Sequence, residues 1–182
     1  ISIGGKLLEM AKKHGVPYIQ LPDTGIQPRM AIGFMFKALA KVVGREDLMQ
    51  QATGLGLSLH AEEFQEQGKA LAQKLQGKLP VMYASNRNYS IAYNWKIKFN
   101  ESGKIPAFYN VFPELNHNEM TGFSAKGGSA SNFFFIFLRD SQDHERIQKR
   151  MGILESLYNK RGLSVETIDI EGSSRMERIF SS

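Results

Sequence analysis

The second half of the chain alternates short apolar runs with longer amphipathic stretches. The amphipathic stretches, at 90–100 and 144–160, have apolar residues at helical spacing. The apolar runs are rich in branched and aromatic residues, as β-strands are, and cover residues 79–84, 105–111, 132–139 and 163–170. Strands and helices of these lengths in alternation predict an α/β fold, a parallel sheet with helices on both faces.

The first part of the chain carries a partial β-α-β pattern. Short strands are predicted at 1–3 and 16–21, with a helix between them that ends near Gly15. A further helix is predicted from Pro28 onward, which puts Arg29 at or near its N-terminus. A long polar helix is expected at 60–78, and a loop rich in Gly, Ser and Ala at 124–131. We place a domain boundary after Gly56, dividing residues 1–56 from residues 57–182.

Composition narrows the class of protein. Hydrophobic residues make up 42% of the chain and charged residues 23%, which is enough apolar material to form a core. The absence of cysteine excludes disulfides, thiolate nucleophiles and zinc–thiolate sites, and it fits a reducing compartment, so we expect a cytoplasmic protein. The longest apolar run, 133–138, is far shorter than the roughly 20 residues of a membrane-spanning helix.

The charge distribution leaves two classes of partner open. The formal net charge is +5, but Lys and Arg are scattered among acidic residues, which suits a small anionic substrate. A basic nucleic-acid-binding module is the alternative, and it predicts salt-sensitive binding. No pair of histidines has the spacing of metal ligands, so no metal site is expected.

Polar side chains gather in the segment 100–123. Glu101 lies where one predicted helix ends, and His117 lies just past the next strand, a region in which open α/β sheets build their sites. Glu101 can act as a general base and His117 as an acid–base group near neutral pH. Arg29 can stabilise an oxyanion. The alternative is that Glu101 is a solvated helix end, His117 a polar loop residue and Arg29 a surface cation.

The segment 113–119, Pro-Glu-Leu-Asn-His-Asn-Glu, preceded by Asn100-Glu101 and by 104–106, Lys-Ile-Pro, resembles a known family. It is similar to the C-terminal domain of bifunctional phosphoglucose/phosphomannose isomerases, which are two-domain sugar-isomerase (SIS) proteins. The stretches 3–7 and 27–29 resemble the latter part of that family's N-terminal domain. The resemblance implies a three-layer α-β-α sandwich with a flavodoxin-like parallel sheet.

The resemblance also implies roles for individual residues. Glu101 resembles the base that moves a proton between C1 and C2 of the sugar, His117 the group that helps open the ring, and Arg29 the cation that steadies the enediolate. Asn118 and Glu119 are expected to contact substrate. Because the family's histidine reaches the site from the neighbouring subunit, a homodimer is implied, with a sugar phosphate as ligand and no cofactor or metal.

The resemblance is incomplete at both ends of the chain. The family's phosphate-binding loop is expected upstream of Ile1, and a helix that contributes a threonine and a lysine to the site is expected downstream of Ser182. Asn94 also stands where the family pattern has an arginine. We therefore expect the 182-residue chain alone to be inactive on glucose 6-phosphate. A SIS-type module that senses a sugar phosphate without converting it is the alternative function.

Overall fold

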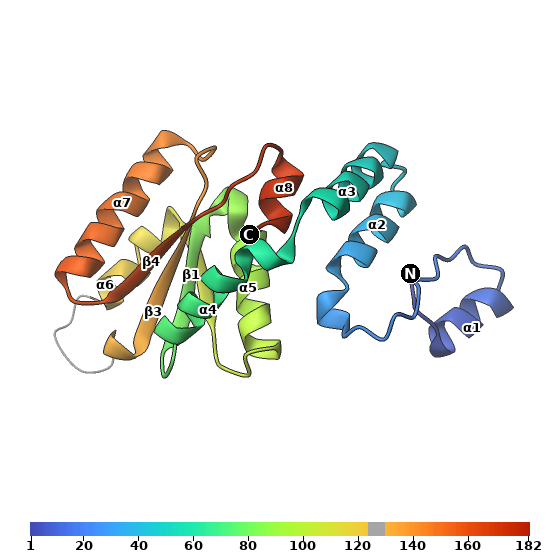
Figure 1. The fold of residues 1–182 in the computed structure, drawn as a ribbon, viewed down its shortest axis with the longest axis horizontal. Helices are drawn as coiled ribbons and strands as arrows, with labels where there is room; N and C mark the ends of the chain where they lie inside the picture. The colour runs from blue at the N-terminus through green and yellow to red at the C-terminus, as the bar shows by residue number, and fades with distance from the viewer. Residues whose placement is uncertain (124–129) are drawn as a thin grey trace. The chain divides into compact units, whose positions relative to one another are not determined.

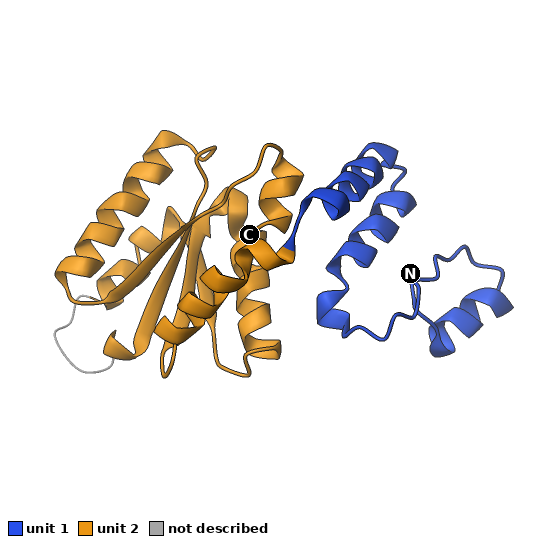
Figure 2. Cartoon of the chain, in the orientation of Figure 1, with its two compact units in different colours: residues 1–60 blue, residues 61–182 orange. Residues whose placement is uncertain are grey.

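The computed structural model describes residues 1–123 and 130–182, which form two compact units, 1–60 and 61–182 (Figure 2). The boundary expected after Gly56 falls inside a helix, α3 (Glu46–Ser58). The helix continues through Gly54 and Gly56 because a glycine weakens a helix by only about 1 kcal/mol and does not stop it. Most of the loop expected at 124–131 lies outside the described residues.

In residues 1–60 the predicted β-α-β pattern is reduced to one helix and one bridge. Helix α1 (Gly5–Lys13) is followed by Gly15, whose φ of 63° turns the chain back. Ser2 and Gln20 then pair as an isolated parallel bridge. Two backbone hydrogen bonds hold it, from the Ser2 amide to the Ile19 carbonyl at 3.0 Å and from the Leu21 amide to the Ser2 carbonyl at 2.9 Å.

The rest of this unit is helical. A single 3₁₀ turn, η1 (Pro28–Met30), leads into α2 (Ile32–Val42), and Gly44 with φ 71° separates α2 from α3. Glu46 and Asp47 occupy the first turn of α3, where a carboxylate complements the helix dipole.

Residues 61–182 form a parallel four-stranded sheet in the order β2-β1-β3-β4, which confirms the predicted fold class (Figure 1). The middle strands β1 and β3 are almost wholly buried, as the apolar run 133–138 predicts. The strands are β1 (Leu79–Ser85), β2 (Phe108–Phe112), β3 (Phe133–Arg139) and β4 (Ser164–Asp169).

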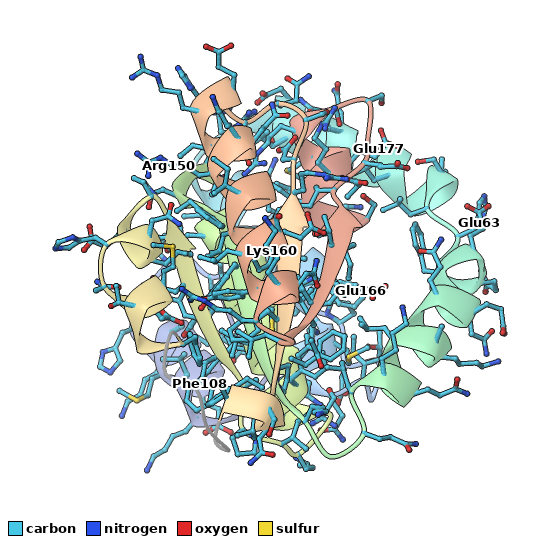
Figure 3. The ribbon with its side chains drawn as sticks, turned by 90° about the vertical axis from the view of Figure 1, so that its left-hand side faces the viewer. Glu63, Phe108, Arg150, Lys160, Glu166 and Glu177 are labelled. Atoms are coloured by element: carbon cyan, nitrogen blue, oxygen red, sulfur yellow. The ribbon has the colours of Figure 1, made fainter. Side chains whose placement is uncertain are left out.

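Helices cover both faces of this sheet and make three layers. On one face Met82 and Ile136 pack with Ile91 of α5 (Tyr89–Glu101) and with residues at the end of α4 (Gln65–Lys74). On the other face Tyr83 and Phe135 pack against α7 (Glu145–Lys160) and around the short helices η4 (Glu114–Asn116) and α6 (Glu119–Gly122). Figure 3 shows α7, with Lys160 labelled on it, in front of the sheet.

Two predicted elements differ in their bounds. The helix expected at 60–78 is a 3₁₀ turn, η2 (Ala61–Phe64), followed by α4, and it ends before Gly77, whose φ of 71° only glycine adopts easily. The strand expected from 105 begins at Phe108, because Pro106 has no N–H to give to a sheet ladder. The remaining elements are η3 (Asn86–Asn88), η5 (Ala130–Asn132) and α8 (Arg175–Phe180).

None of the helices in 1–123 and 130–182 is both long enough and apolar enough to span a bilayer.

Candidate functional site

Glu101 is the last residue of α5 and its side chain is exposed. A carboxylate at a helix C-terminus is unfavourable, because the helix dipole is negative there. The turn that follows is tight: a Cβ on Gly103 would lie 2.8 Å from the Phe99 carbonyl oxygen, and Lys104 adopts φ 56°, rare for a residue with a side chain. The Asn100 side-chain amide closes the turn by donating to the Ile105 carbonyl at 2.9 Å. Glu101 therefore sits on a well-defined backbone at a position that costs the helix stability.

His117 lies directly after η4, beyond the carboxyl end of β2. Its backbone amide donates to the Glu114 carbonyl at 2.9 Å, and the preceding Leu115 is fully buried in the α7-side core. The imidazole itself is exposed. The fold thus fixes the backbone of His117 and leaves its ring open to a ligand or to another chain.

Glu101 and His117 lie at opposite ends of β2. Strands β1 and β2 are parallel, so α5, which connects them, runs back and ends at the amino edge of the sheet. His117 follows the carboxyl end of the same strand. A strand of five residues is about 16 Å long, whereas a proton-transferring side chain must come within about 3 Å of its target. Within one chain the two residues therefore belong to opposite edges of the sheet.

Arg29 occupies the 3₁₀ turn η1, next to the N-terminus of α2, as the sequence predicts. Pro28 stands at the first position of that turn. The Arg29 side chain is half-buried, and its Nη1 donates to Oε1 of Gln27 at 3.4 Å. Arg29 belongs to residues 1–60, while Glu101 and His117 belong to residues 61–182.

The two expected substrate-contact residues differ in their surroundings. Asn118 is exposed, and its amide donates to Glu114 Oε1 at 3.1 Å. Glu119 is half-buried and accepts hydrogen bonds from the Tyr83 hydroxyl at 2.7 Å and from the Asn110 amide. Burial, followed by the charge interactions with Tyr158 and Glu119, raises the pKa of Tyr83. The Glu119 carboxylate thus links α6 to β1 and β2 within the chain.

The sequence reasoning missed a buried polar cluster at the carboxyl ends of β1 and β3. Ser85 closes β1, Asp140 follows β3, and both are buried. One signal in the sequence could have predicted it. A polar residue stands at the end of each of two apolar strands, and these two strands are neighbours in the sheet. The cluster consists of Ser85, Asn88, Asp140, Asp143, Arg175 and Arg178.

Among residues 1–123 and 130–182, no group of three or more His, Asp or Glu side chains is arranged to hold a metal ion.

The chain is similar to known proteins over most of its length. The chain is 30% identical over 178 residues to the bifunctional phosphoglucose/phosphomannose isomerase of Aquifex aeolicus, covering 98% of this chain and 55% of that protein. It is 32% identical over 137 residues to the D-glucosamine-6-phosphate 4-epimerase of Sulfolobus acidocaldarius, covering 71% of this chain and 42% of that protein. The chain therefore spans about half the length, or less, of these relatives.

A solved structure supports the fold. The glucosamine-6-phosphate deaminase of Thermotoga maritima superposes with a TM-score of 0.58 at 13% identity, over 94% of this chain and 53% of that one. Residues 64–182 match the family described as the bacterial phospho-glucose isomerase C-terminal SIS domain. With a match over more than half of its length, and with the parallel sheet and three layers already described, the chain belongs to that family.

Proposed function

We propose that the protein containing this chain is an aldose–ketose isomerase that interconverts glucose 6-phosphate, and mannose 6-phosphate as well, with fructose 6-phosphate. The observation that carries the proposal is Glu101, an exposed carboxylate that stands against the helix dipole on a tightly built turn, in a chain of the phosphoglucose isomerase family. The helix dipole disfavours a carboxylate at that position, and a role in proton transfer gives a reason for it.

The chemistry needs three functions. Glu101 takes the proton from C2 of the open-chain aldose, and the electron pair forms the C1–C2 double bond of a cis-enediolate. The same carboxylate returns the proton to C1 while the proton on O2 is transferred to O1, which leaves the C2 carbonyl of the ketose. The sugar has no net change in hydrogen or electrons, so no cofactor is needed. Arg29 stabilises the enediolate charge, and His117 moves the proton that opens the ring.

The positions of Glu101 and His117 make the homodimer part of this proposal. A two-fold axis across the middle of β2 places each Glu101 beside the partner subunit's His117. β2 is an edge strand whose outer side meets no other strand among the described residues. Aromatic side chains flank it: Phe108 on β2 is 52% exposed, and Tyr93 on α5, which contacts Tyr109, is 45% exposed. These are features of a surface that pairs with another chain.

The test is the Glu101→Gln change in the full-length protein. We expect kcat to fall on the order of 100-fold or more, because general base catalysis is lost, while equilibrium binding of fructose 6-phosphate is retained. Glu63→Gln, which changes an exposed carboxylate on η2, is the matched control and should keep full activity. Unchanged turnover in Glu101→Gln, with the wild type active, would exclude Glu101 as the base.

The alternative functions give different results in the same assay. A sugar-phosphate sensor binds fructose 6-phosphate without turnover in the wild type as well as in the variant. The name of the Sulfolobus relative raises a third outcome, epimerisation at C4 of an amino-sugar phosphate. Following the products by ¹³C NMR separates these reactions, because each one changes a different carbon.

A further inference from the structure

The carboxyl ends of β1 and β3 are the place where an open α/β sheet ordinarily binds its ligand, because the chain crosses from one side of β1 to the other there. In this chain that place holds two buried aspartates. Asp140 is fully buried, and Asp143 is 6% exposed. Neither lies in a regular strand or helix, and the turn between them is closed by the Asp143 backbone amide, which donates to the Asp140 carbonyl at 3.0 Å.

Asp143 engages polar side chains at this edge of the sheet. Its carboxylate accepts a hydrogen bond from the Ser85 hydroxyl at 2.7 Å and lies 3.4 Å from the Asn88 side-chain amide. Ser85 and Asn88 come from the end of β1 and the turn that leads into α5, the usual source of donors for a bound anion. These donors are therefore occupied by a carboxylate of the chain itself.

Asp140 is the centre of a second set of contacts, which come from α8. Arg178 Nη1 donates to Asp140 Oδ1 at 3.0 Å, and Arg175 Nη1 lies 3.5 Å from Oδ2. Arg178 also reaches the Ile170 carbonyl, and Arg175 binds Asn88 and the Arg87 carbonyl at 3.0 Å. The Arg178 side chain is only 14% exposed, so its ion pair is largely shielded from water.

These arginine contacts join α8 to the sheet edge, together with the contact of Arg178 with the Ser141 hydroxyl at 3.5 Å and apolar packing. It is six residues long, too short to be stable alone, and its N-terminus is closed by reciprocal hydrogen bonds between the Ser173–Ser174 segment and Glu177. Met176 is its one buried residue. The two arginines therefore contribute much of the interaction that holds α8 at this edge of the sheet.

We propose that this cluster is an internal lock: the chain's own carboxylates fill the ligand position between β1 and β3, and through Arg175 and Arg178 they hold α8 in place. Asp140 faces both arginines, and Asp143 accepts from Ser85 and lies beside the Asn88 amide, so the polar side chains of the cluster are engaged within the chain. It follows that residues 61–182 do not bind a phosphate group at this edge. The lock does not depend on the isomerase proposal, since it concerns structure and anion binding and not turnover.

Hydrogen exchange measured by mass spectrometry on the 182-residue chain tests the lock. We expect Arg178→Gln, and separately Asp140→Asn, to speed exchange of the 171–182 segment on the order of tenfold while β1 and β3 change little. The control is Arg139→Gln, which removes an arginine from the exposed pair with Asp169, 2.6 Å apart and one residue before Asp140. This control should leave the exchange of α8 as it is in the wild type.

A double variant and a phosphate titration test the lock further. If a single variant does not fold, the double variant Asp140→Asn/Arg178→Gln removes both members of the shorter ion pair together and leaves only Arg175, which is 35% exposed, without its carboxylate. α8 protection equal to wild type in every folded variant would overturn the lock. Titration with inorganic phosphate, followed through the amide NMR signals of residues 85–90, should give no saturable shift in the wild type, and a saturable shift would also overturn it.

Discussion

Two buried tyrosines on the α7 face of the sheet differ in what their hydroxyls meet. Tyr83 donates to Glu119 at 2.7 Å. The Tyr158 hydroxyl is buried without a hydrogen bond to any described residue, and burial raises the pKa of Tyr158 to about 12. The two rings, with centroids 6.4 Å apart, share one core cluster, so a comparison between them isolates the hydroxyl.

We expect Tyr83→Phe to lower the free energy of unfolding by about 1–3 kcal/mol, because the half-buried Glu119 carboxylate loses one of its two donors and keeps the Asn110 amide. Tyr158→Phe should change that free energy by less than about 1 kcal/mol, or raise it, because the lost hydroxyl has no partner. Urea unfolding of the two variants and the wild type gives both values. A larger loss in Tyr158→Phe than in Tyr83→Phe would contradict the hydrogen-bond assignment.

Asp143 gives a pH-dependent prediction. Burial raises the pKa of its carboxyl above the ordinary value of 3.8, against the opposing effect of the hydrogen bond from Ser85. The folded state then holds the proton more tightly than the unfolded state, so this group lowers stability as pH rises from 3.8 to the raised pKa. Relative to Asp143→Asn, the wild type should lose stability over that interval. Thermal unfolding at a series of pH values checks the sign, and the opposite slope would refute it.

At the residue scale the sequence offers candidate site residues but not their contacts. Glu101 and His117 are visible because they lie in a short distinctive segment. The pairing of Asp140 with Arg178 is not visible, because it joins residues far apart in the chain that only the sheet order and the placing of α8 bring together. Nor does the sequence show that Glu119 accepts a hydrogen bond from the Tyr83 hydroxyl.

Among the elements, the buried strands are the most predictable and the turns the least. The run 133–138 specifies β3, since an uninterrupted apolar segment of this length fits a strand buried on both faces. The two strands expected in residues 1–60 reduce to one bridge, because strands need neighbours and the described residues of that unit supply none. The turn after α5 depends on the close approach of Gly103 to the Phe99 carbonyl oxygen, and the spacing of apolar residues does not predict such a contact.

That turn supports a prediction about the site. In Gly103→Ala the new Cβ would lie 2.8 Å from the Phe99 carbonyl oxygen, so the end of α5 must shift, at a cost of about 1–3 kcal/mol. Because Glu101 lies in that last turn, we also expect kcat of the full-length protein to fall. Calorimetric unfolding and steady-state kinetics measure the two effects.

The matched control is Gly152→Ala within α7. A Cβ there meets no atom within 4 Å, and alanine stabilises a helix interior by about 0.5–1 kcal/mol relative to glycine. The control should therefore raise stability and leave kcat unchanged. Equal behaviour of the two variants would show that the turn after α5 does not constrain Glu101.

At the scale of the whole molecule, the sheet separates the two residues to which we assign proton transfer. Glu101 ends α5 at the amino edge, and His117 follows β2 at the carboxyl edge. Residues 64–182 match a family described by its C-terminal SIS domain, and the chain spans about half of the relatives' length. We propose that a complete site takes its carboxylate from one chain and its imidazole from another.

Subunit mixing distinguishes a site shared between two chains from a site within one chain. Full-length Glu101→Gln and His117→Gln proteins, each inactive alone, are denatured together in equal amounts and refolded. If the site is shared, each mixed dimer has one site with both native groups, so random pairing should restore about a quarter of wild-type activity. If both groups act within one chain, no mixed dimer has an intact site, and the mixture would stay as inactive as its two components.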